Sequence, residues 1–432
     1  MNSPLRAGIL GFGNVASATI ASLMNNRDLI ARKTRRPIEI TRVATRTPAR
    51  ASGRVPPGCR VDDDLLGLVD DPSLDVVVEL TGSVPQGRQL LLRALAGGRH
   101  VVTANKALLA LHGEEILDAA QAAGRRVLFE GAVAVSIPIV KILREAAAAN
   151  RLDAVVGILN GTSNYILSQM SEHGASFAEA LQEAQARGYA EADPTLDING
   201  QDAAHKISLL AALAFGMPID FEQVACQGIE AVDRDDVEHG RRLGFELKLI
   251  AQARGSDRGL YIGVQPTLVR RQSLLAQVPG AMNGIALSGD LMGPAFLYGS
   301  GAGGTQTASA VLADLIELAN IPQGASALGD YNMGHRRSLP AQARKPLPLV
   351  CPFYLRARMP AGPDAHARLR AVLDAADIEL THAEQRPCAD GATDHLFLTG
   401  RCAEARVRRV LPELQALAGP GRPALALPLL DE

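Results

Sequence analysis

The spacing of apolar residues divides the chain into regions of different character. From Arg6 to about Phe129, short apolar runs alternate with amphipathic segments, a pattern typical of a parallel sheet with helices on both faces. The expected strands are residues 7–10, 38–44, 76–80, 100–103 and 127–129, and the expected helices include residues 90–96 and 114–123, the second of them stopped by Gly124. This region is predicted to be a doubly wound α/β unit.

Beyond Pro138 the pattern becomes a mixture of helices and strands. We expect helices at 141–149, from Thr162, and from Ser176, where Ser176 and Glu179 form a capping-box signature, together with a strand at 154–159 and short extended pieces between 265 and 289. The tail from Val350 predicts strands at 353–358, 378–383 and 395–399 with helices at 365–375 and 403–417, an order that suits a small α+β module. The predicted units are residues 1–135 with 300–330 returning to them, 136–299, a polar linker at 331–349, and 350–432.

Composition narrows the class of partner. The 432 residues suffice for two or three domains, and a net charge of −2 with 3% aromatic residues argues against a nucleic-acid surface. No apolar run reaches the length of a membrane span and the amino terminus lacks a signal-peptide layout, so we expect a cytoplasmic protein that binds a small molecule rather than a membrane. The five cysteines, Cys59, Cys226, Cys351, Cys388 and Cys402, have no metal-finger spacing and are expected to be reduced thiols.

A glycine-rich turn follows the first predicted strand and opens a helix, which is the context of a dinucleotide-binding fingerprint. Gly11 permits the tight turn and Gly13 lets a pyrophosphate approach the backbone at a helix amino terminus; the whole segment is Gly11, Phe12, Gly13, Asn14, Val15 and Ala16. A turn without a ligand is the alternative. Arg46, at the end of the second strand, favours NADP over NAD, unless it is only a solvated charge. Thr81, directly after one predicted strand, and Thr103, at the end of another, are also candidate cofactor contacts.

The segment from Gly188 to Lys206 combines four carboxylates, Glu191, Asp193, Asp197 and Asp202, with one lysine. If a helix begins near Asn199, Asp202 and Lys206 lie four residues apart on one face, which Leu209 and Leu213 continue as an apolar stripe. A partly desolvated ammonium is a better proton donor, and the carboxylates can hold the ammonium of an amino acid. The alternative is an exposed ion pair at helical spacing.

Three other segments are weaker candidates. Lys106 follows a predicted strand and could reach a ligand at the sheet edge, or be a surface residue. The segment from Glu130 to Pro138 is rich in small residues and reads as a hinge, although its carbonyls could hold a hard cation. Residues 160–165 lead into a helix with Thr162 or Ser163 as its cap. The glycines of 299–304, including Gly301 and Gly303, precede a helix at 308–318 and either close over the cofactor or form a tight connection.

Taken together, these motifs resemble homoserine dehydrogenase over residues 5–320. The resemblance implies a Rossmann domain that binds NADP or NAD, a mixed domain that binds the substrate and forms a homodimer or homotetramer, and interconversion of aspartate β-semialdehyde and L-homoserine. It assigns proton donation to Lys206, contact with cofactor and substrate to Lys106, and binding of the amino acid to Glu191 and Asp202. It further implies a pocket supported by Asp197, ligand contacts at Gly188 and Gly303, and a sodium site at the main-chain oxygens of Glu130, Val133, Val135 and Ile137.

The chain departs from the family pattern in two places. Val135 and Ser136 stand where members of the family usually carry two glycines, which puts the cation site and the substrate range in question. The tail resembles an ACT regulatory module, but residues 359–363 lack the expected Asp, Pro and Gly, so that a dimer contact is an alternative to effector binding. Two rival functions remain: a dehydrogenase for another small amino aldehyde or alcohol, and a catalytically silent sensor of nucleotide and amino acid.

Overall fold

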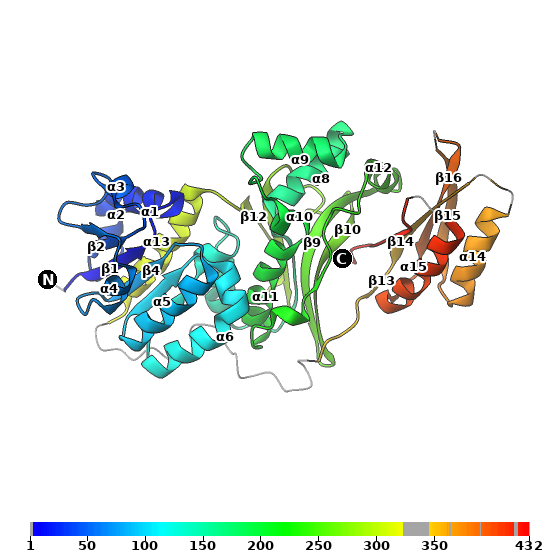
Figure 1. Cartoon of the computed structure of the whole chain (residues 1–432). Helices are drawn as coiled ribbons and strands as arrows, with labels where there is room; N and C mark the ends of the chain where they lie inside the picture. Colours follow the sequence, from blue (N-terminus) through cyan, green and yellow to red (C-terminus); the bar gives the residue numbers. More distant parts are fainter. Residues whose placement is uncertain are drawn as a thin grey trace.

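Three main sheets organise the computed structural model, which describes residues 3–322, 345–360, 362, 364–388, 390–418 and 422–431 (Figure 1). The first sheet is parallel with six strands, the second is mixed with six strands, and the third is antiparallel with four strands near the carboxyl end. Among these residues, the longest apolar helices fall short of what crossing a bilayer requires. The fold class predicted from the sequence is confirmed.

The parallel sheet has the strand order β3-β2-β1-β4-β5-β6. Its strands are β1 (Leu5–Leu10), β2 (Ile38–Ala44), β3 (Arg60–Asp62), β4 (Val76–Glu79), β5 (His100–Thr103) and β6 (Val127–Leu128). Its helices are α1 (Asn14–Asn25), α2 (Arg27–Ala31), α3 (Pro48–Ala51), α4 (Leu65–Asp70), α5 (Val84–Ala96) and α6 (Lys106–Ala123). The order reverses between β1 and β4, and ligands of open α/β sheets bind outside the carboxyl ends of the strands at such a switch point.

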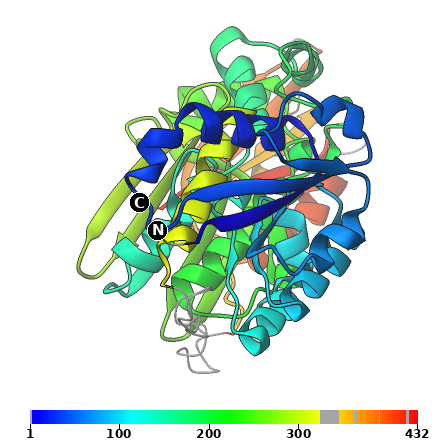
Figure 2. The same cartoon turned by 90° about the vertical axis from the view of Figure 1, so that its left-hand side faces the viewer.

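A later helix, α13 (Gly304–Asn320), returns to this unit and packs beside α1, as the yellow and dark blue helices show in Figure 2. Its apolar residues Val311 and Leu315 share a buried cluster with Ile9 and Ile20. The returning segment therefore completes the core on that face of the parallel sheet. Residues 323–330, which the sequence also assigned to this unit, lie outside the described residues.

The mixed sheet has the order β12-β11-β7-β9-β10-β8 and supports the residues predicted to bind substrate. Its strands are β7 (Leu152–Ile158), β8 (Ala225–Cys226), β9 (Phe245–Ser256), β10 (Gly259–Arg270), β11 (Met282–Gly289) and β12 (Gly293–Ser300). Its helices are α7 (Ile139–Lys141), α8 (Gly161–His173), α9 (Phe177–Ala186), α10 (Thr195–Ile198), α11 (Gln201–Phe215) and α12 (Arg234–Arg242). Because α11 packs against both this sheet and α6, it joins the two units.

The carboxyl-terminal module contains the sheet β15-β16-β14-β18. Its elements are β13 (Val350–Cys351), β14 (Phe353–Pro360), α14 (Ala365–Ala375), β15 (Leu380–Pro387), β16 (Ala392–Thr399), β17 (Cys402–Ala403), α15 (Glu404–Ala418) and β18 (Leu425–Pro428). A fully buried ion pair of 2.7 Å between Arg356 and Asp236 ties β14 to α12. Most of the predicted linker, residues 331–344, lies outside the described residues, as do Ala361 and Pro363.

Several local predictions were wrong at their boundaries. The helix expected at 141–149 instead begins at Ile139 and ends at Ala146 after a π-helical stretch, because the Glu130 carboxylate accepts hydrogen bonds from the backbone N–H groups of Val140 and Lys141. The extended pieces expected at 265–289 are parts of two long strands, β10 and β11. The helix expected from residue 114 begins at Lys106, since the Asn105 side chain caps it.

Candidate active site

Two lysines and one aspartate form a buried charged group between the two units. The Asp202 carboxylate binds Lys206 Nζ through Oδ2 at 2.7 Å and Lys106 Nζ through Oδ1 at 3.0 Å. Asp202 and Lys206 come from α11, as their spacing predicts, and both residues are only 6% exposed. Lys106 is the first residue of α6, at the carboxyl edge of the parallel sheet, and its side chain keeps 39% exposure. The interpretation of Asp202 and Lys206 as an exposed ion pair is therefore wrong.

Neighbouring polar groups fix the orientation of this cluster. Lys206 Nζ also donates to the main-chain carbonyl of Leu159, at 2.7 Å, just after β7 ends. The Asn160 side-chain amide donates to Asp202 at 2.9 Å and to Asp197 at 2.7 Å. Because Asn160 bridges the two carboxylates, Asp197 supports the cluster from the side of α10.

The electrostatics of the group favour a lysine that releases its proton readily. Burial lowers the pKa of Lys206, and the nearby ammonium of Lys106 lowers it further, while Asp202 acts in the opposite direction. Burial would raise the pKa of Asp202, but the charges of Lys206 and Lys106 outweigh it and hold this pKa well below its usual range. The Asp202 carboxylate, by contrast, raises the pKa of Lys106. The two lysines therefore differ in acidity although they share one partner.

The glycine turn lies at the same edge of the parallel sheet. Gly11 has φ +89°, and a Cβ there would lie 2.9 Å from the carbonyl oxygen of Leu80, so this position requires glycine. A Cβ at Gly13 would meet nothing within 4 Å, which leaves open space in front of α1. No side chain caps α1 at Gly13, and the first N–H groups of a helix have no partner within the helix, which favours the binding of an anion there.

A buried carboxylate that the sequence did not single out connects two candidate cofactor contacts. Glu79, fully buried at the end of β4, accepts hydrogen bonds from the hydroxyls of Thr81 at 2.6 Å and Thr103 at 2.7 Å. The Thr103 hydroxyl also accepts a bond from the backbone N–H of Asn105, the residue that caps α6. These bonds join the ends of β4 and β5 and fix the start of α6, where Lys106 lies, at the carboxyl edge of the parallel sheet.

The loop before α13 touches both halves of the site. Gly304 packs against Asn14, since a Cβ on Gly304 would lie 3.4 Å from the Asn14 carbonyl oxygen. A Cβ on Gly301 would collide with the buried side chain of Asn283, whose amide donates at 3.3 Å to the Leu159 carbonyl that also binds Lys206. The loop therefore spans from the amino terminus of α1 to the lysine group, which brings the glycine turn and Lys206 to one region of the molecule.

The hinge predicted to hold a cation contacts the same loop. Val135 has φ +55°, a left-handed conformation that is strained for a β-branched residue, so the turn keeps a shape suited to glycine without one. The Ser136 hydroxyl donates to the Ser300 carbonyl at 2.7 Å. Glu130 is 1% exposed, and burial raises the pKa of its carboxyl despite two backbone hydrogen bonds. Among the described residues, no group of three or more His, Cys, Asp or Glu side chains is placed to hold a metal ion.

Other predicted residues take different positions. Gly188 ends α9 with φ +73° and is exposed, as is Glu191, whose charge nevertheless helps to raise the pKa of Lys106. Asp193 accepts hydrogen bonds from the hydroxyl and N–H of Thr195 and so serves a local turn. The prediction that Thr162 or Ser163 caps α8 was wrong, because the cap is Asn160.

The nucleotide end carries two arginines. Arg46 is exposed just after β2. Arg54, which sequence reasoning missed, places its guanidinium 5.4 Å from the ring centre of Phe12, inside the glycine turn, and donates to the Ser17 hydroxyl on α1. Arg54 therefore places a positive charge beside the amino-terminal turn of α1.

Comparisons with known proteins identify the family of the chain. The family model for the homoserine dehydrogenase NAD-binding domain matches residues 11–130, and the homoserine dehydrogenase model matches residues 138–316. A homoserine dehydrogenase of Pseudomonas aeruginosa is 38% identical, with 98% of each chain covered. The crystal structure of one from Thiobacillus denitrificans has a TM-score of 0.91 at 39% identity, covering 99% of this chain and 98% of that one. A hyperthermophilic archaeal homoserine dehydrogenase mutant, solved in complex with NADPH, has a TM-score of 0.62 at 26% identity, covering 74% of this chain and 100% of that one. The chain belongs to the homoserine dehydrogenase family of NAD(P)-dependent oxidoreductases.

Proposed function

We propose that the protein interconverts L-aspartate 4-semialdehyde and L-homoserine with NADP(H), in the branch of aspartate-family biosynthesis that leads to threonine, methionine and isoleucine. The observation that carries the proposal is the Lys106–Asp202–Lys206 group, which meets the glycine turn through the loop at 301–304. A reduced nicotinamide, when bound, supplies hydride to the aldehyde carbon. The residues of this chain have to bind and orient the substrate and deliver a proton to its oxygen.

Lys206 is the proposed proton donor to the carbonyl oxygen. Its ammonium is buried and its pKa is lowered, which brings its acidity closer to that useful for general acid catalysis. Asp202 and the Leu159 carbonyl fix the direction of the ammonium. Lys106, which shares Asp202 but remains partly exposed, is proposed to contact both the cofactor and the substrate.

The substrate amino group is proposed to bind on the acidic side of the cluster. Both oxygens of Asp202 already have cationic partners, so Asp202 contributes charge and orientation, whereas the exposed Glu191 carboxylate is available for an incoming ammonium. Asp197, through Asn160, supports the pocket, and the exposed Gly188 lets the substrate approach the backbone.

NADP is proposed as the preferred cofactor, with NAD as the alternative. The amino terminus of α1 and Gly13 would receive the pyrophosphate, with Phe12, Asn14 and Val15 at the turn. Arg46 and Arg54 supply the positive charge that an additional ribose phosphate requires. The glycines at 301 and 303 are proposed to close over the cofactor.

A monovalent cation such as sodium is proposed to bind the main-chain oxygens of Glu130, Val133, Val135 and Ile137. The left-handed Val135 supports this fit, because the turn does not need glycine to keep its course. Such a cation would hold the hinge between the two units in a fixed shape.

The oligomeric state, the cellular location and the domain boundaries of the protein are also proposals. We propose a homodimer or homotetramer in the cytoplasm, with the boundaries predicted from the sequence.

A direct test measures near-ultraviolet absorbance of the reduced nicotinamide with homoserine and either NADP or NAD. We expect turnover with homoserine and a lower KM for NADP. Lys206→Met should lower kcat by about 10² to 10⁴ with binding partly retained. Lys248→Met is the matched control, because Lys248 is another buried lysine, bonded to Asn164 and the Val278 carbonyl, and its loss should leave kcat within a few-fold.

The results also separate the rival functions. Turnover of another amino alcohol in place of homoserine would favour the related dehydrogenase, for which Val135 and Ser136 reshape the corner of the site. Ligand binding without turnover of any substrate would favour the sensor.

A further inference from the structure

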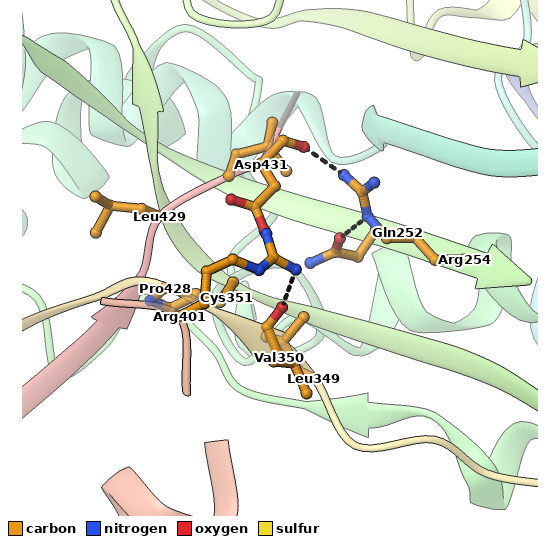
Figure 3. Close-up of a pocket in the computed structure, with 10 residues that line it drawn as sticks. Gln252, Arg254, Leu349, Val350, Cys351, Arg401, Pro428, Leu429 and Asp431 are labelled. Carbon is orange, nitrogen blue, oxygen red and sulfur yellow. Dashed lines mark hydrogen bonds and ion pairs between the residues drawn. The ribbon is translucent and has the colours of Figure 1, made fainter. Parts of the chain in front are cut away.

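A cavity of about 130 Å³ lies between the mixed sheet and the carboxyl-terminal module, away from the lysine group (Figure 3). One wall comes from β9 through Gln252 and Arg254, and another from Val350 and Cys351. The end of the chain, residues 428–431, crosses the opening beside Arg401. The cavity therefore joins four segments that are separated in the sequence.

Two arginines in this cavity are held by Asp431, one by its side-chain carboxylate and the other by its main-chain oxygen. Arg401 pairs with the side chain of Asp431 and also donates to the Val350 carbonyl at 2.9 Å. Arg254 donates to the main-chain oxygen of Asp431 at 2.8 Å and to the Gln252 side chain at 2.8 Å. Burial lowers the pKa of Arg254, while the nearby Asp431 acts in the opposite direction.

We propose that this cavity is a binding site for a small aliphatic carboxylate, which replaces the Asp431 carboxylate on Arg401, beside the guanidinium of Arg254. Arginine forks suit carboxylates, and the anion now in place is itself a carboxylate. Leu349, Pro428 and Leu429 give the cavity an apolar side that fits a short hydrocarbon chain. Its volume is about ten times what one water needs, so a ligand of several heavy atoms fits.

The Asp431 carboxylate is suited to act as an exchangeable occupant. Its side chain is 33% exposed and that of Arg401 is 59% exposed, so both can be reached from solvent. The backbone of this segment is held separately, by bonds from Leu429 N–H to the Pro352 carbonyl and from Leu430 N–H to the Leu268 carbonyl, neither of which involves the Asp431 side chain. An incoming carboxylate therefore competes with one partly exposed ion pair.

The position of the cavity connects it with the catalytic unit. Arg254 and Gln252 pair across the sheet with Ala154 and Val156 of β7. Directly after β7 comes Leu159, whose carbonyl binds Lys206. A ligand here would contact the same sheet that supports the active-site lysine.

Titration calorimetry of the full-length protein tests the proposal, with butyrate as probe and neutral butyramide as its isostere, at constant ionic strength. We expect saturable butyrate binding with a Kd on the order of 1 mM and no binding of butyramide. Asp431→Asn removes the internal competitor and should tighten butyrate binding about tenfold, which corresponds to about 1.4 kcal/mol. Arg401→Gln should weaken it about tenfold, whereas Arg401→Lys should retain part of it.

The matched control is Asp374→Asn, which removes an exposed carboxylate paired with Arg370 on α14. It should bind butyrate as the unmodified protein does. Equal binding of butyramide, an unchanged Kd in Asp431→Asn, or no saturable binding in that variant would each overturn the proposal. If inorganic phosphate binds as tightly as butyrate, the assignment to carboxylates is also overturned.

Discussion

Replacing Asp202 with asparagine is the most informative change, because this carboxylate joins two cations. Lys206 is 6% exposed and lies 2.7 Å from Asp202, while Lys106 lies 3.0 Å from it with a side chain that is 39% exposed. Asp202→Asn keeps the shape of the side chain and removes its charge. Lys206 would then be a buried ammonium with no anionic partner.

The structure sets the expected size of the effect. Removing one partner of a buried ion pair costs about 3–5 kcal/mol, because the other charge is left uncompensated. The bond to Lys106 is partly exposed and adds about 1 kcal/mol or less. Asn160 and the Leu159 carbonyl remain as neutral partners, so we expect Asp202→Asn to lower the free energy of unfolding by about 3 kcal/mol.

A double-mutant cycle with Lys206→Met isolates the charge. Methionine fills a similar volume without an ammonium, so the double variant should be about 2 kcal/mol more stable than the sum of the two single changes implies. Urea unfolding of the four proteins measures this coupling. Additivity within about 0.5 kcal/mol would refute the claim that the Asp202 charge compensates Lys206.

The pH dependence provides an independent check with a definite sign. Burial lowers the pKa of Lys206, and without Asp202 it should be lower still. The folded variant then binds fewer protons than the unfolded chain, so the penalty is complete below the folded pKa and disappears as pH rises toward the unfolded value of about 10.4. The stability difference between Asp202→Asn and the unmodified protein should therefore shrink at alkaline pH.

Four further substitutions test other parts of the structure. Gly11→Ala should lower the melting temperature, because φ is +89° and a carbonyl oxygen lies 2.9 Å from the new Cβ. Gly13→Ala should leave the melting temperature unchanged and raise the KM for the cofactor about tenfold or more. Equal melting temperatures of the two variants would contradict this reasoning. Val135→Gly should raise the free energy of unfolding in urea by about 0.5–1 kcal/mol, since left-handed strain of roughly 1–2 kcal/mol exceeds the entropy cost of glycine. A clear decrease in stability would count against strain at this position. Burial lowers the pKa of His100 from 6.5 to about 4. The neutral imidazole therefore contributes about 3 kcal/mol to the free energy of unfolding above pH 6.5, and this contribution is lost as pH falls toward 4. His100→Asn keeps an acceptor for the Arg126 N–H and should flatten the acid side of a plot of urea midpoint against pH.

Local patterns predicted much of the fold. The runs at 38–44 and 100–103 coincide with β2 and β5, and Gly124 ends α6 in the left-handed conformation expected of it. The capping box of Ser176 and Glu179 is present in α9. These features depend on residues a few positions apart, so the sequence displays them directly. The strand β9 was missed because it is buried on both sides and lacks the alternation by which a half-buried strand is detected.

The active-site group could be predicted only where its members are close in sequence. Asp202 and Lys206 are one helical turn apart, and their contact was predicted from that spacing. The partners Glu79 and Asn283 were not predicted, because each serves residues from other elements and has no local pattern of its own.

Their burial nevertheless shows why they are needed. A buried carboxylate or amide without partners costs several kcal/mol. The hydroxyls of Thr81 and Thr103 bind the Glu79 carboxylate, and the Leu159 carbonyl accepts a bond from the Asn283 amide nitrogen, which lowers this cost. Each such bond fixes the end of a strand that carries a site residue. The rigidity of the site therefore depends on polar pairs from distant parts of the chain, and a change in either residue should loosen the lysine group without touching it.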